Sequence, residues 1–348
     1  MNFYNKYRPN SFDQIKGKSA EILKKQIELN KTSHAYIFAG PPGTGKTTLA
    51  RVAAISLLNE GNDRSIQDMI LNDNHPDVYE VNCAVNNGVD NIRDNILQLA
   101  RLSPTLGKYK IFILDECHML TTQAQTSLIK ITEEPPAHIK FFFCTTEPNK
   151  ILRAIQTRCQ TFLMRKLSND DIVDILSDVA NKENIEVENS ALKIISQEAN
   201  GSARTALSIF QQLSILDVVT EDDTRELLNR SPKHLAYNLA FSIANCDRTE
   251  ACRLIQLAHQ EGRDLSSLIL ETVNSFSEAF KYVLFKTKKV DRIEEIETIA
   301  KNVPTLSIVE ITEQLYNIFC NIRQTVSEDI VCMTGILKII DWYAKTKA

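Results

Sequence analysis

A glycine-rich segment that ends in lysine and threonine has the composition of a phosphate-binding loop. It reads GPPGTGKT (40–47) and matches the pattern GxxxxGK[ST] at every defined position. Glycines let backbone N–H groups curl around phosphate oxygens, and the positive end of a following helix favours the same charge. We expect Lys46 to reach the outer phosphates of ATP and Thr47 to hold Mg²⁺. The alternative is a chance glycine-rich turn. The residues predicted to bind the nucleotide here are Gly40, Pro41, Pro42, Gly43, Thr44, Gly45, Lys46, Thr47 and Thr48.

Two adjacent acids follow an apolar run and would complete this chemistry. The segment 111–116 reads IFILDE, the pattern of a buried strand that carries acids at its C-terminal end. Ligands bind at that edge of a parallel sheet. Asp115 suits a Mg²⁺-bound role, and Glu116 is placed to orient or deprotonate an attacking water. The pattern is weak alone and becomes specific when it follows a complete phosphate-binding loop.

The elements that must position these residues form a regular alternation. We predict strands over 34–40, 77–83, 110–116 and 140–146, and helices over 47–59, 89–102 and 122–134. Apolar strands that alternate with helices predict a parallel sheet covered on both faces, which is an α/β fold of the P-loop, RecA-like class.

The rest of the chain is expected to be helical, because eight of the ten prolines lie at or before Pro148. Ser168 with Asp171 three residues later predicts a helix start. Three amphipathic helices follow, and roughly five or six more are expected after the turn-like RSP segment (230–232). We therefore predict an α/β domain over 1–166, a small helical domain over 167–229 and a second helical domain over 230–348.

Bulk composition is that of an ordinary soluble protein. The chain has 348 residues, of which 43% are hydrophobic and 24% charged, and its net charge is -4. No apolar run approaches the length of a membrane span, and the N-terminus lacks a signal-peptide pattern, so we expect a cytoplasmic protein. Its 8 cysteines form no CxxC pair, so we expect reduced thiols.

Several segments together resemble the ATPase subunits of clamp loaders, which are AAA+ proteins. Three short pieces, HAY, EEPP and TTEP, are closer to the gamma/tau subunit of bacterial DNA polymerase III than to replication factor C small subunits. The segments that carry the resemblance are YRPNSFDQIKG (7–17), HAYIFAGPPGTGKTT (34–48), ILDECHML (113–120), LIKITEEPP (128–136), CTTEP (144–148), TRC (157–159) and GSARTAL (201–207).

The resemblance implies roles for residues that would otherwise be ambiguous. Thr146 matches the sensor-1 position, which holds the water or the γ-phosphate; Thr145 and Thr146 could also bond the backbone at a strand end. Arg204 matches sensor 2, in the helical lid (167–229). Arg158 matches the arginine finger, which acts on ATP bound to the neighbouring subunit, and its alternative is a surface arginine.

The N-terminal stretch matches the segment that lines the adenine pocket in this family. The residues concerned are Tyr7, Arg8, Ile15 and Gly17. For Tyr7 and Arg8, simple packing of an N-terminal arm is the alternative.

The resemblance also implies partners. Arg93, Lys130 and Lys150 match positions that face DNA and would contact phosphate without reading sequence; solvated side chains on helix faces are the alternative. A ring of about five subunits, held by the collar (230–348), would open a sliding clamp and place it on primer–template DNA. Leu99, Leu102 and Pro104 could contact the clamp or belong to the core.

Some features depart from the family. The stretch 59–81 contains no cysteine, where the bacterial subunit carries a four-cysteine zinc module, so we predict no zinc. The finger motif reads TRC in place of SRC, and no tail is expected after the collar, which favours a phage-encoded or divergent bacterial version. Two rival functions remain: another AAA+ DNA motor, such as a branch-migration helicase or an origin-binding ATPase, and a non-hydrolysing structural subunit of the same ring.

Overall fold

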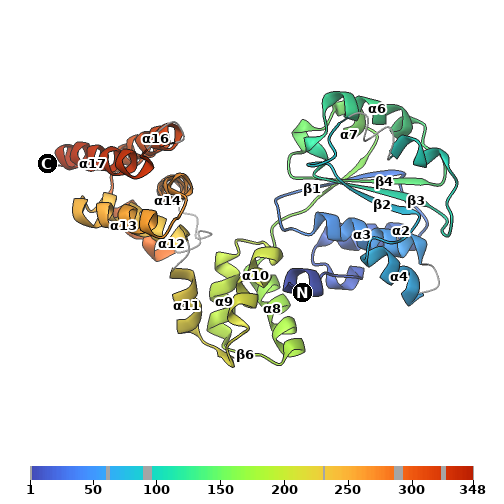
Figure 1. The fold of residues 1–348 in the computed structure, drawn as a ribbon, viewed down its shortest axis with the longest axis horizontal. Coiled ribbons are helices and arrows are strands. Elements are labelled where there is room, and N and C mark those ends of the chain that lie inside the picture. Colours follow the sequence, from blue (N-terminus) through green and yellow to red (C-terminus); the bar gives the residue numbers. More distant parts are fainter. Residues whose placement is uncertain are drawn as a thin grey trace. The chain divides into compact units, whose positions relative to one another are not determined.

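The computed structural model describes residues 2–59, 63–88, 96–229, 232–285, 293–322 and 327–347. The chain forms two compact units, residues 1–219 and residues 220–348 (Figure 1). Each unit has a hydrophobic core of its own.

The first unit is built on a five-stranded sheet with the order β2-β3-β4-β1-β5. Every pair of neighbouring strands is parallel, which confirms the predicted α/β fold. The fifth strand was not predicted, because it is short and only its phenylalanine is buried. The strands are β1 Ala35–Ala39, β2 Val78–Asn82, β3 Lys110–Asp115, β4 Ile139–Thr145 and β5 Gln160–Leu163.

Helices cover both faces of this sheet, as predicted (Figure 1). One face carries α2 Lys18–Glu28, α3 Lys46–Leu58 and α4 Arg64–Leu71, and the other carries α6 Thr122–Glu133 and α7 Arg153–Gln156. Successive strand residues point to opposite faces. Phe38 therefore packs in the cluster of α2 and α3, while Ile37 packs in the cluster of α6.

Short elements lie between the main ones. They are α1 Phe3–Lys6, η1 Phe12–Gln14, η3 Leu99–Arg101, η4 Cys117–Met119 and η5 Pro148–Lys150. The helix predicted over 89–102 is wrong from residue 98 onward: residues 96–97 are π-helical, but residues 99–101 form a 3-10 turn and residue 102 is extended. The exposed Ser103 and then Pro104 follow, and proline disfavours helical backbone in the residue before it. The first half of that predicted helix lies outside the described residues.

Three helices follow the sheet in the first unit, with the predicted start. They are α8 Asn169–Glu183, α9 Asn189–Glu198 and α10 Ala203–Leu213. Ser168 and Asp171 form a reciprocal capping box at the start of α8, in which each side chain accepts the other's backbone N–H. Two short strands, β6 Glu186–Val187 and β7 Val218–Val219, pair in parallel beside them.

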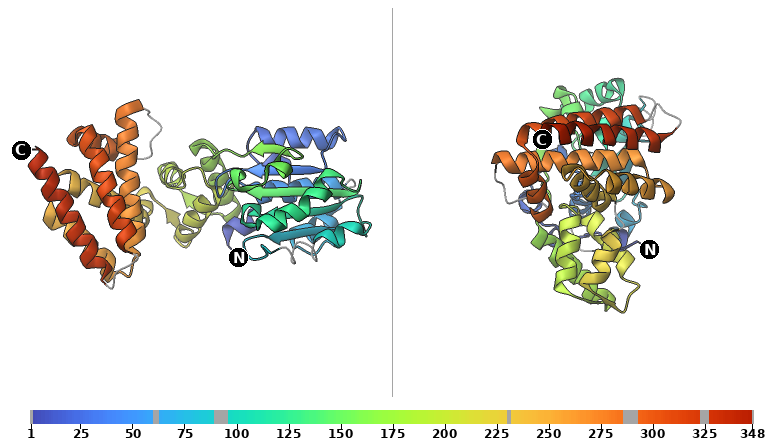
Figure 2. Two further views of the ribbon diagram at one scale, coloured as in Figure 1. Left: turned by 90° about the horizontal axis from the view of Figure 1, so that it is seen from above. Right: turned by 90° about the vertical axis from the view of Figure 1, so that its left-hand side faces the viewer.

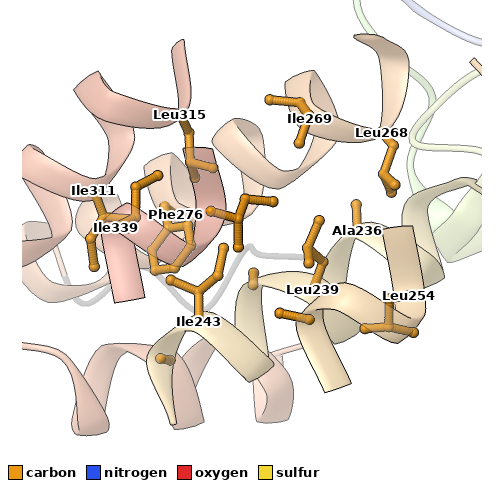
Figure 3. Packing of buried hydrophobic residues seen from close by; sticks show 14 of the residues in the cluster. Ala236, Leu239, Ile243, Leu254, Leu268, Ile269, Phe276, Ile311, Leu315 and Ile339 are labelled. Atoms are coloured by element: carbon orange, nitrogen blue, oxygen red, sulfur yellow. The ribbon is translucent and has the colours of Figure 1, made fainter. Parts of the chain in front are cut away.

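The second unit is helical throughout its described residues. Its elements are α11 Glu221–Asn229, α12 Pro232–Ala244, α13 Arg248–Gln260, α14 Leu265–Phe285, α15 Ile293–Asn302, α16 Thr305–Ile322 and α17 Glu328–Lys347. Helices α14, α16 and α17, orange to red in Figure 2, lie side by side. Figure 3 shows the core between them, where Phe276 lies among Ile243, Ile311 and Ile339. No described helix is long and apolar enough to span a membrane.

Residues 220–229 belong to the second compact unit, whereas the sequence predicts them in the small helical domain. The division into three domains stays a prediction.

The cysteines are free thiols, and Cys83, Cys117, Cys144 and Cys332 are buried. Burial raises the pKa of Cys83 and of Cys332 to about 12. These thiols are therefore protonated and unreactive at neutral pH. Cys320 is exposed.

Candidate nucleotide-binding site

A cavity in the first unit brings together four segments that are far apart in the sequence. The phosphate-binding loop lines it from Pro42 to Thr48, and Asp115 and Glu116 line it from the end of β3. The N-terminal arm contributes Tyr7, Arg8 and Ile15. The small helical part contributes Arg204 from α10. Most of the residues that the sequence assigned to one chemistry therefore meet in this cavity.

The loop adopts backbone conformations that favour glycine. Gly43 and Gly45 have φ values of 75° and 87°, and residues that carry a side chain rarely adopt such values. Gly43 also lies close to Ser202, because a Cβ atom added to it would lie 2.1 Å from the Ser202 Oγ. Gly45 caps the start of α3, so the N-terminal end of that helix points at the loop.

Lys46 is buried at the start of α3 and is 6% exposed. Its Nζ donates to the carbonyl oxygens of Gly40 and Pro41, each at 2.9 Å. Burial lowers the pKa of Lys46, and the nearby Glu116 carboxylate opposes this effect. An ammonium group held by backbone carbonyls alone is electrostatically under-compensated, which favours an anion beside it.

Thr47 and Asp115 lie next to each other, as the metal prediction requires. The Thr47 Oγ1 donates to the Asp115 Oδ1 at 2.9 Å, and the Glu116 backbone N–H donates to the same oxygen at 3.1 Å. A hydroxyl and a carboxylate are hard oxygen donors, and Mg²⁺ commonly takes one or two such ligands and completes its shell with phosphates and waters. The pair therefore fits Mg²⁺. Within the described ranges, no group of three or more His, Cys, Asp or Glu side chains gathers as a metal site.

Glu116 has a left-handed backbone with a φ of 49°. This conformation costs free energy for a residue other than glycine, and such residues cluster at functional sites. The Glu116 carboxylate is 36% exposed, so water can reach it. The Thr146 hydroxyl, just after β4, donates to the Glu116 Oε2 at 3.4 Å. Thr146 therefore contacts the predicted catalytic acid although it does not line the cavity.

The cavity is lined by four cations, Arg8, Lys16, Lys46 and Arg204. Burial lowers the pKa of Arg8, and the positive charges of Arg51 and Arg204 lower it further, against the acids Glu80 and Asp73. The Arg204 guanidinium lies over the ring of Tyr4, 5.9 Å from its centroid. A concentration of positive charge in a partly buried cavity favours a polyvalent anion.

The N-terminal arm both lines the cavity and packs on the helical part of the unit. The Tyr7 hydroxyl donates to Glu183 of α8, and the Lys6 Nζ lies 2.6 Å from the same carboxylate. Phe3 packs on Phe210 of α10, with the ring centroids 6.2 Å apart. The packing alternative for the arm and its predicted role at the nucleotide are therefore compatible.

Several predicted nucleotide-binding residues do not line the cavity: Gly17, Gly40 and Pro41. Gly40 and Pro41 act through their carbonyl oxygens, which hold Lys46. Gly17 precedes α2 with a φ of 112° and shapes the arm.

Arg158 lies away from the cavity, at the end of the short helix α7. Its guanidinium donates to the Ala154 carbonyl at 2.7 Å and to the Glu133 Oε1 at 2.6 Å. The Arg158 side chain is 30% exposed, so solvent or another chain can reach it. Arg158 is not among the residues that line the cavity of its own chain, and its position is compatible with action on a neighbouring site.

The predicted DNA-facing residues that are described lie on the surface of the first unit. Lys130 is exposed on α6, and Lys150 is exposed at the end of η5. The Lys150 Nζ donates to Glu147 at 3.0 Å. Arg93 lies outside the described residues.

Sequence reasoning missed some of the cavity lining, including Tyr4, Gln14, Lys16, Ile175 and Leu207. Tyr4 belongs to the same aromatic N-terminal segment as Tyr7, which was a usable signal. Ile175 and Leu207 lie on amphipathic helices, where an apolar residue that faces a ligand cannot be distinguished from a core residue by its spacing.

Comparisons with known proteins agree with this geometry. Residues 15–168 match the family described as DNA polymerase III, delta subunit, and residues 171–215 match the DNA polymerase III clamp loader subunit, ATPase lid domain. The lid match covers most of α8 and all of α9 and α10.

Curated relatives extend the similarity over almost the whole chain. DNA polymerase III subunit tau of Bacillus subtilis is 30% identical over 97% of this chain and 62% of its own length. Subunit gamma/tau of Mycoplasma genitalium is 34% identical over 80% of this chain and 49% of its own length. The chain thus spans about half to two thirds of these two relatives. Subunit gamma of Buchnera aphidicola subsp. Schizaphis graminum is 30% identical over 85% of this chain and 86% of its own length.

Solved structures support the fold. The RuvB Holliday junction branch migration motor of Thermotoga maritima aligns with a TM-score of 0.50 at 19% identity, over 74% of this chain and 86% of that chain. A variant of the same protein aligns with a TM-score of 0.52 at 17% identity, over 81% and 99%. At this identity the likeness concerns architecture and does not transfer the branch-migration activity. The lid match and the Buchnera relative, which aligns over 86% of its own length, together show that this chain belongs to the gamma/tau family of DNA polymerase III clamp-loader subunits.

Proposed function

We propose that this chain is the ATP-hydrolysing motor subunit of a clamp loader, which opens a sliding clamp and places it on primer–template DNA. The observation that carries the proposal is the cavity where Lys46, Glu116 and Arg204 converge. The chain carries the full set of predicted catalytic residues, which favours an ATP-hydrolysing subunit over the alternative of a non-hydrolysing structural subunit. Family membership supports the clamp-loading role over that of a branch-migration helicase or an origin-binding ATPase.

The proposed reaction is attack of water on the γ-phosphorus of ATP. Glu116 accepts a proton from the water while the water oxygen bonds to the γ-phosphorus. The bond between the γ-phosphorus and the β,γ-bridging oxygen breaks, and ADP leaves with the electron pair. Thr47 and Asp115 would hold Mg²⁺, which neutralises charge on the phosphate oxygens when bound. Thr146, 3.4 Å from Glu116, is positioned to hold the same water.

The cations of the cavity would stabilise the charge of the triphosphate. Lys46 would move from the loop carbonyls to the outer phosphates, and Arg204 would leave the Tyr4 ring for the γ-phosphate. Tyr7, Arg8, Ile15 and Gly17 are the proposed adenine-side residues, of which the first three line the cavity.

Arg158 is the proposed finger for the ATP of an adjacent subunit, so hydrolysis would depend on a ring of about five subunits. The collar (230–348) would hold this ring, and 1–166 and 167–229 would be the motor and the lid. If Arg158→Ala left ATP turnover with DNA and clamp unchanged, the proposed role in trans would be wrong. We expect the turnover to fall at least about 1000-fold.

DNA would be bound through its phosphates. Arg93, Lys130 and Lys150 are the proposed contacts, so a triple charge-removing variant should weaken primer–template binding and reduce the slope of log affinity against log salt. A DNA-replication role of this kind would be cytoplasmic.

The test is ATP turnover of the purified chain with and without primed DNA and candidate clamps, at several salt concentrations. We expect turnover that primed DNA and a clamp together increase. Strand displacement of duplex DNA in the absence of any clamp would instead support a helicase.

A further inference from the structure

His118 lies against the predicted catalytic acid, and no role has been assigned to it above. Its side chain is 8% exposed and belongs to the short turn η4, which begins directly after Glu116. The His118 Nδ1 lies 3.4 Å from the Glu116 Oε2, and the His118 Nε2 lies 3.5 Å from the Glu147 Oε1. One buried ring therefore lies between two carboxylates.

The ring is fixed in place from β4. The Thr145 Oγ1, which is fully buried, lies 3.2 Å from the His118 Nδ1. The same oxygen accepts the backbone N–H of Glu147 at 3.0 Å. Glu147 in turn accepts from the Lys150 Nζ. The orientation of the imidazole plane is thus set by neighbouring groups, as is usual for functional histidines.

The Glu116 carboxylate, in contrast, has weak anchors of its own. The hydroxyl of Thr146 reaches it at 3.4 Å, which is a long hydrogen bond. A carboxylate that must take a proton from water in one orientation needs a firm donor. Contacts of 3.4 Å in a ligand-free site commonly shorten when the substrate binds. The Nδ1 of His118, 3.4 Å from the Glu116 Oε2, can supply this donor from a side chain that is 8% exposed.

We propose that His118 is a positioning residue for hydrolysis, and that its Nδ1–H orients the Glu116 carboxylate toward the attacking water. The inference rests on the proposed ATPase function of the same site. In its neutral form the imidazole carries a single N–H, so that form can donate to Glu116 or to Glu147 but not to both. The productive tautomer is the one with the proton on Nδ1, facing Glu116.

Two substitutions distinguish the roles of the two ring nitrogens of His118. The amide nitrogen of Asn occupies nearly the position of Nδ1, so His118→Asn keeps a donor toward Glu116. The amide of Gln reaches nearly the position of Nε2, so His118→Gln keeps a donor toward Glu147 alone. His118→Leu removes both. As a matched control, His138→Asn changes a histidine directly before β4, at the end of that strand opposite to Thr145.

The experiment measures kcat and KM for ATP, ATP affinity by calorimetry and the thermal midpoint of each variant, with primed DNA present. We expect kcat to fall about 10- to 100-fold in His118→Leu and in His118→Gln, while His118→Asn stays within about threefold of the unsubstituted chain. ATP affinity should be unchanged in all three, and the control should match the unsubstituted chain.

Three results would overturn the inference. These are equal rates for the Asn and Gln variants, wild-type rates for the Leu variant, or a loss of kcat that follows lost ATP affinity and a lowered midpoint. The last result would mean that His118 is only structural. If the unsubstituted chain hydrolysed no ATP, the proposed function itself would fail and this inference with it.

Discussion

The two units of the molecule differ in whether they bury charged side chains. Among the described residues, the lysines, arginines, histidines and aspartates that are buried as whole residues all belong to the first unit: Lys46, Arg51, His75, Asp77, Lys110 and Lys140. The second unit buries aliphatic and aromatic side chains together with hydroxyls, and those of Ser242 and Thr272 bond to carbonyls of their own helices.

The burial of charged residues in the first unit alone indicates where the chain tolerates a cost in folding free energy for the sake of function. Burying a charge costs free energy unless partners compensate it. Arg51 and Asp77 are well compensated, the first by Glu80 and Asp73 and the second by three backbone N–H groups. Lys46, which faces the cavity, has only carbonyl partners in its hydrogen bonds with described residues. The second unit follows the ordinary rule that apolar burial stabilises a fold.

The largest stability effect should come from the core of the second unit. Phe276 is fully buried among the helices of Figure 3, so Phe276→Ala should lower the free energy of unfolding of this unit by about 3–5 kcal/mol. Chemical denaturation measures this. The exposed Phe285 on the same helix is the matched control, and Phe285→Ala should have almost no effect. A similar loss in both variants would contradict the comparison.

Removal of the buried charge of Lys46 should weaken ligand binding without lowering stability, unlike the truncation of Phe276. Lys46→Met should weaken ATP binding roughly 100-fold, about 2.7 kcal/mol, because a charge-assisted contact to phosphate is lost. The thermal midpoint without nucleotide should stay the same or rise, because a desolvated ammonium is removed. Calorimetry and thermal unfolding test both parts, with the exposed Lys25→Met as control. A lowered midpoint in Lys46→Met would show that this lysine is structural.

A second buried lysine gives a pH prediction. Burial lowers the pKa of Lys140 from 10.5 to about 8. Above 10.5 neither state holds the proton; as pH falls toward 8 the unfolded state binds it first, so stability is lost on lowering the pH. This group should therefore make the unfolding free energy rise by about 2 kcal/mol between about pH 8 and about pH 10. Lys140→Met should remove that rise, and the exposed Lys193→Met should keep it.

The smallest effect concerns the helical part of the first unit, which follows simple patterning rules. Ser168→Ala breaks the capping box of α8 and should lower stability by about 1 kcal/mol, whereas Ser168→Thr keeps the hydroxyl and should lose less. Equal losses in thermal unfolding would mean that the box contributes nothing.

Much of the fold follows from local patterns. The strand, loop and helix over 34–59 and the capping box at Ser168 were predictable, because each rests on spacing within one segment. The strand β5 was not, because its pairing beside β1 depends on tertiary contact rather than on an apolar run.

The site was predictable as a set of motifs but not as a geometry. The pattern IFILDE (111–116) indicates an acid at a strand end, yet nothing in it gives the left-handed backbone of Glu116 or its contact with His118. Likewise, Arg158 and Glu133 stand in separate quoted motifs, and their 2.6 Å contact depends on how α6 and α7 pack. Contacts between residues that are far apart in the sequence cannot be predicted from the periodicity of apolar residues.

The central claim is that this cavity binds ATP through Lys46 and hydrolyses it with Glu116. The most direct test measures ATP affinity and single-turnover hydrolysis in parallel for the unsubstituted chain and Glu116→Gln. We predict that both bind ATP with similar affinity and that hydrolysis by the Gln variant is slower by about 100- to 10,000-fold. A chain that binds no ATP, or a Gln variant that hydrolyses it at the unsubstituted rate, would contradict the account.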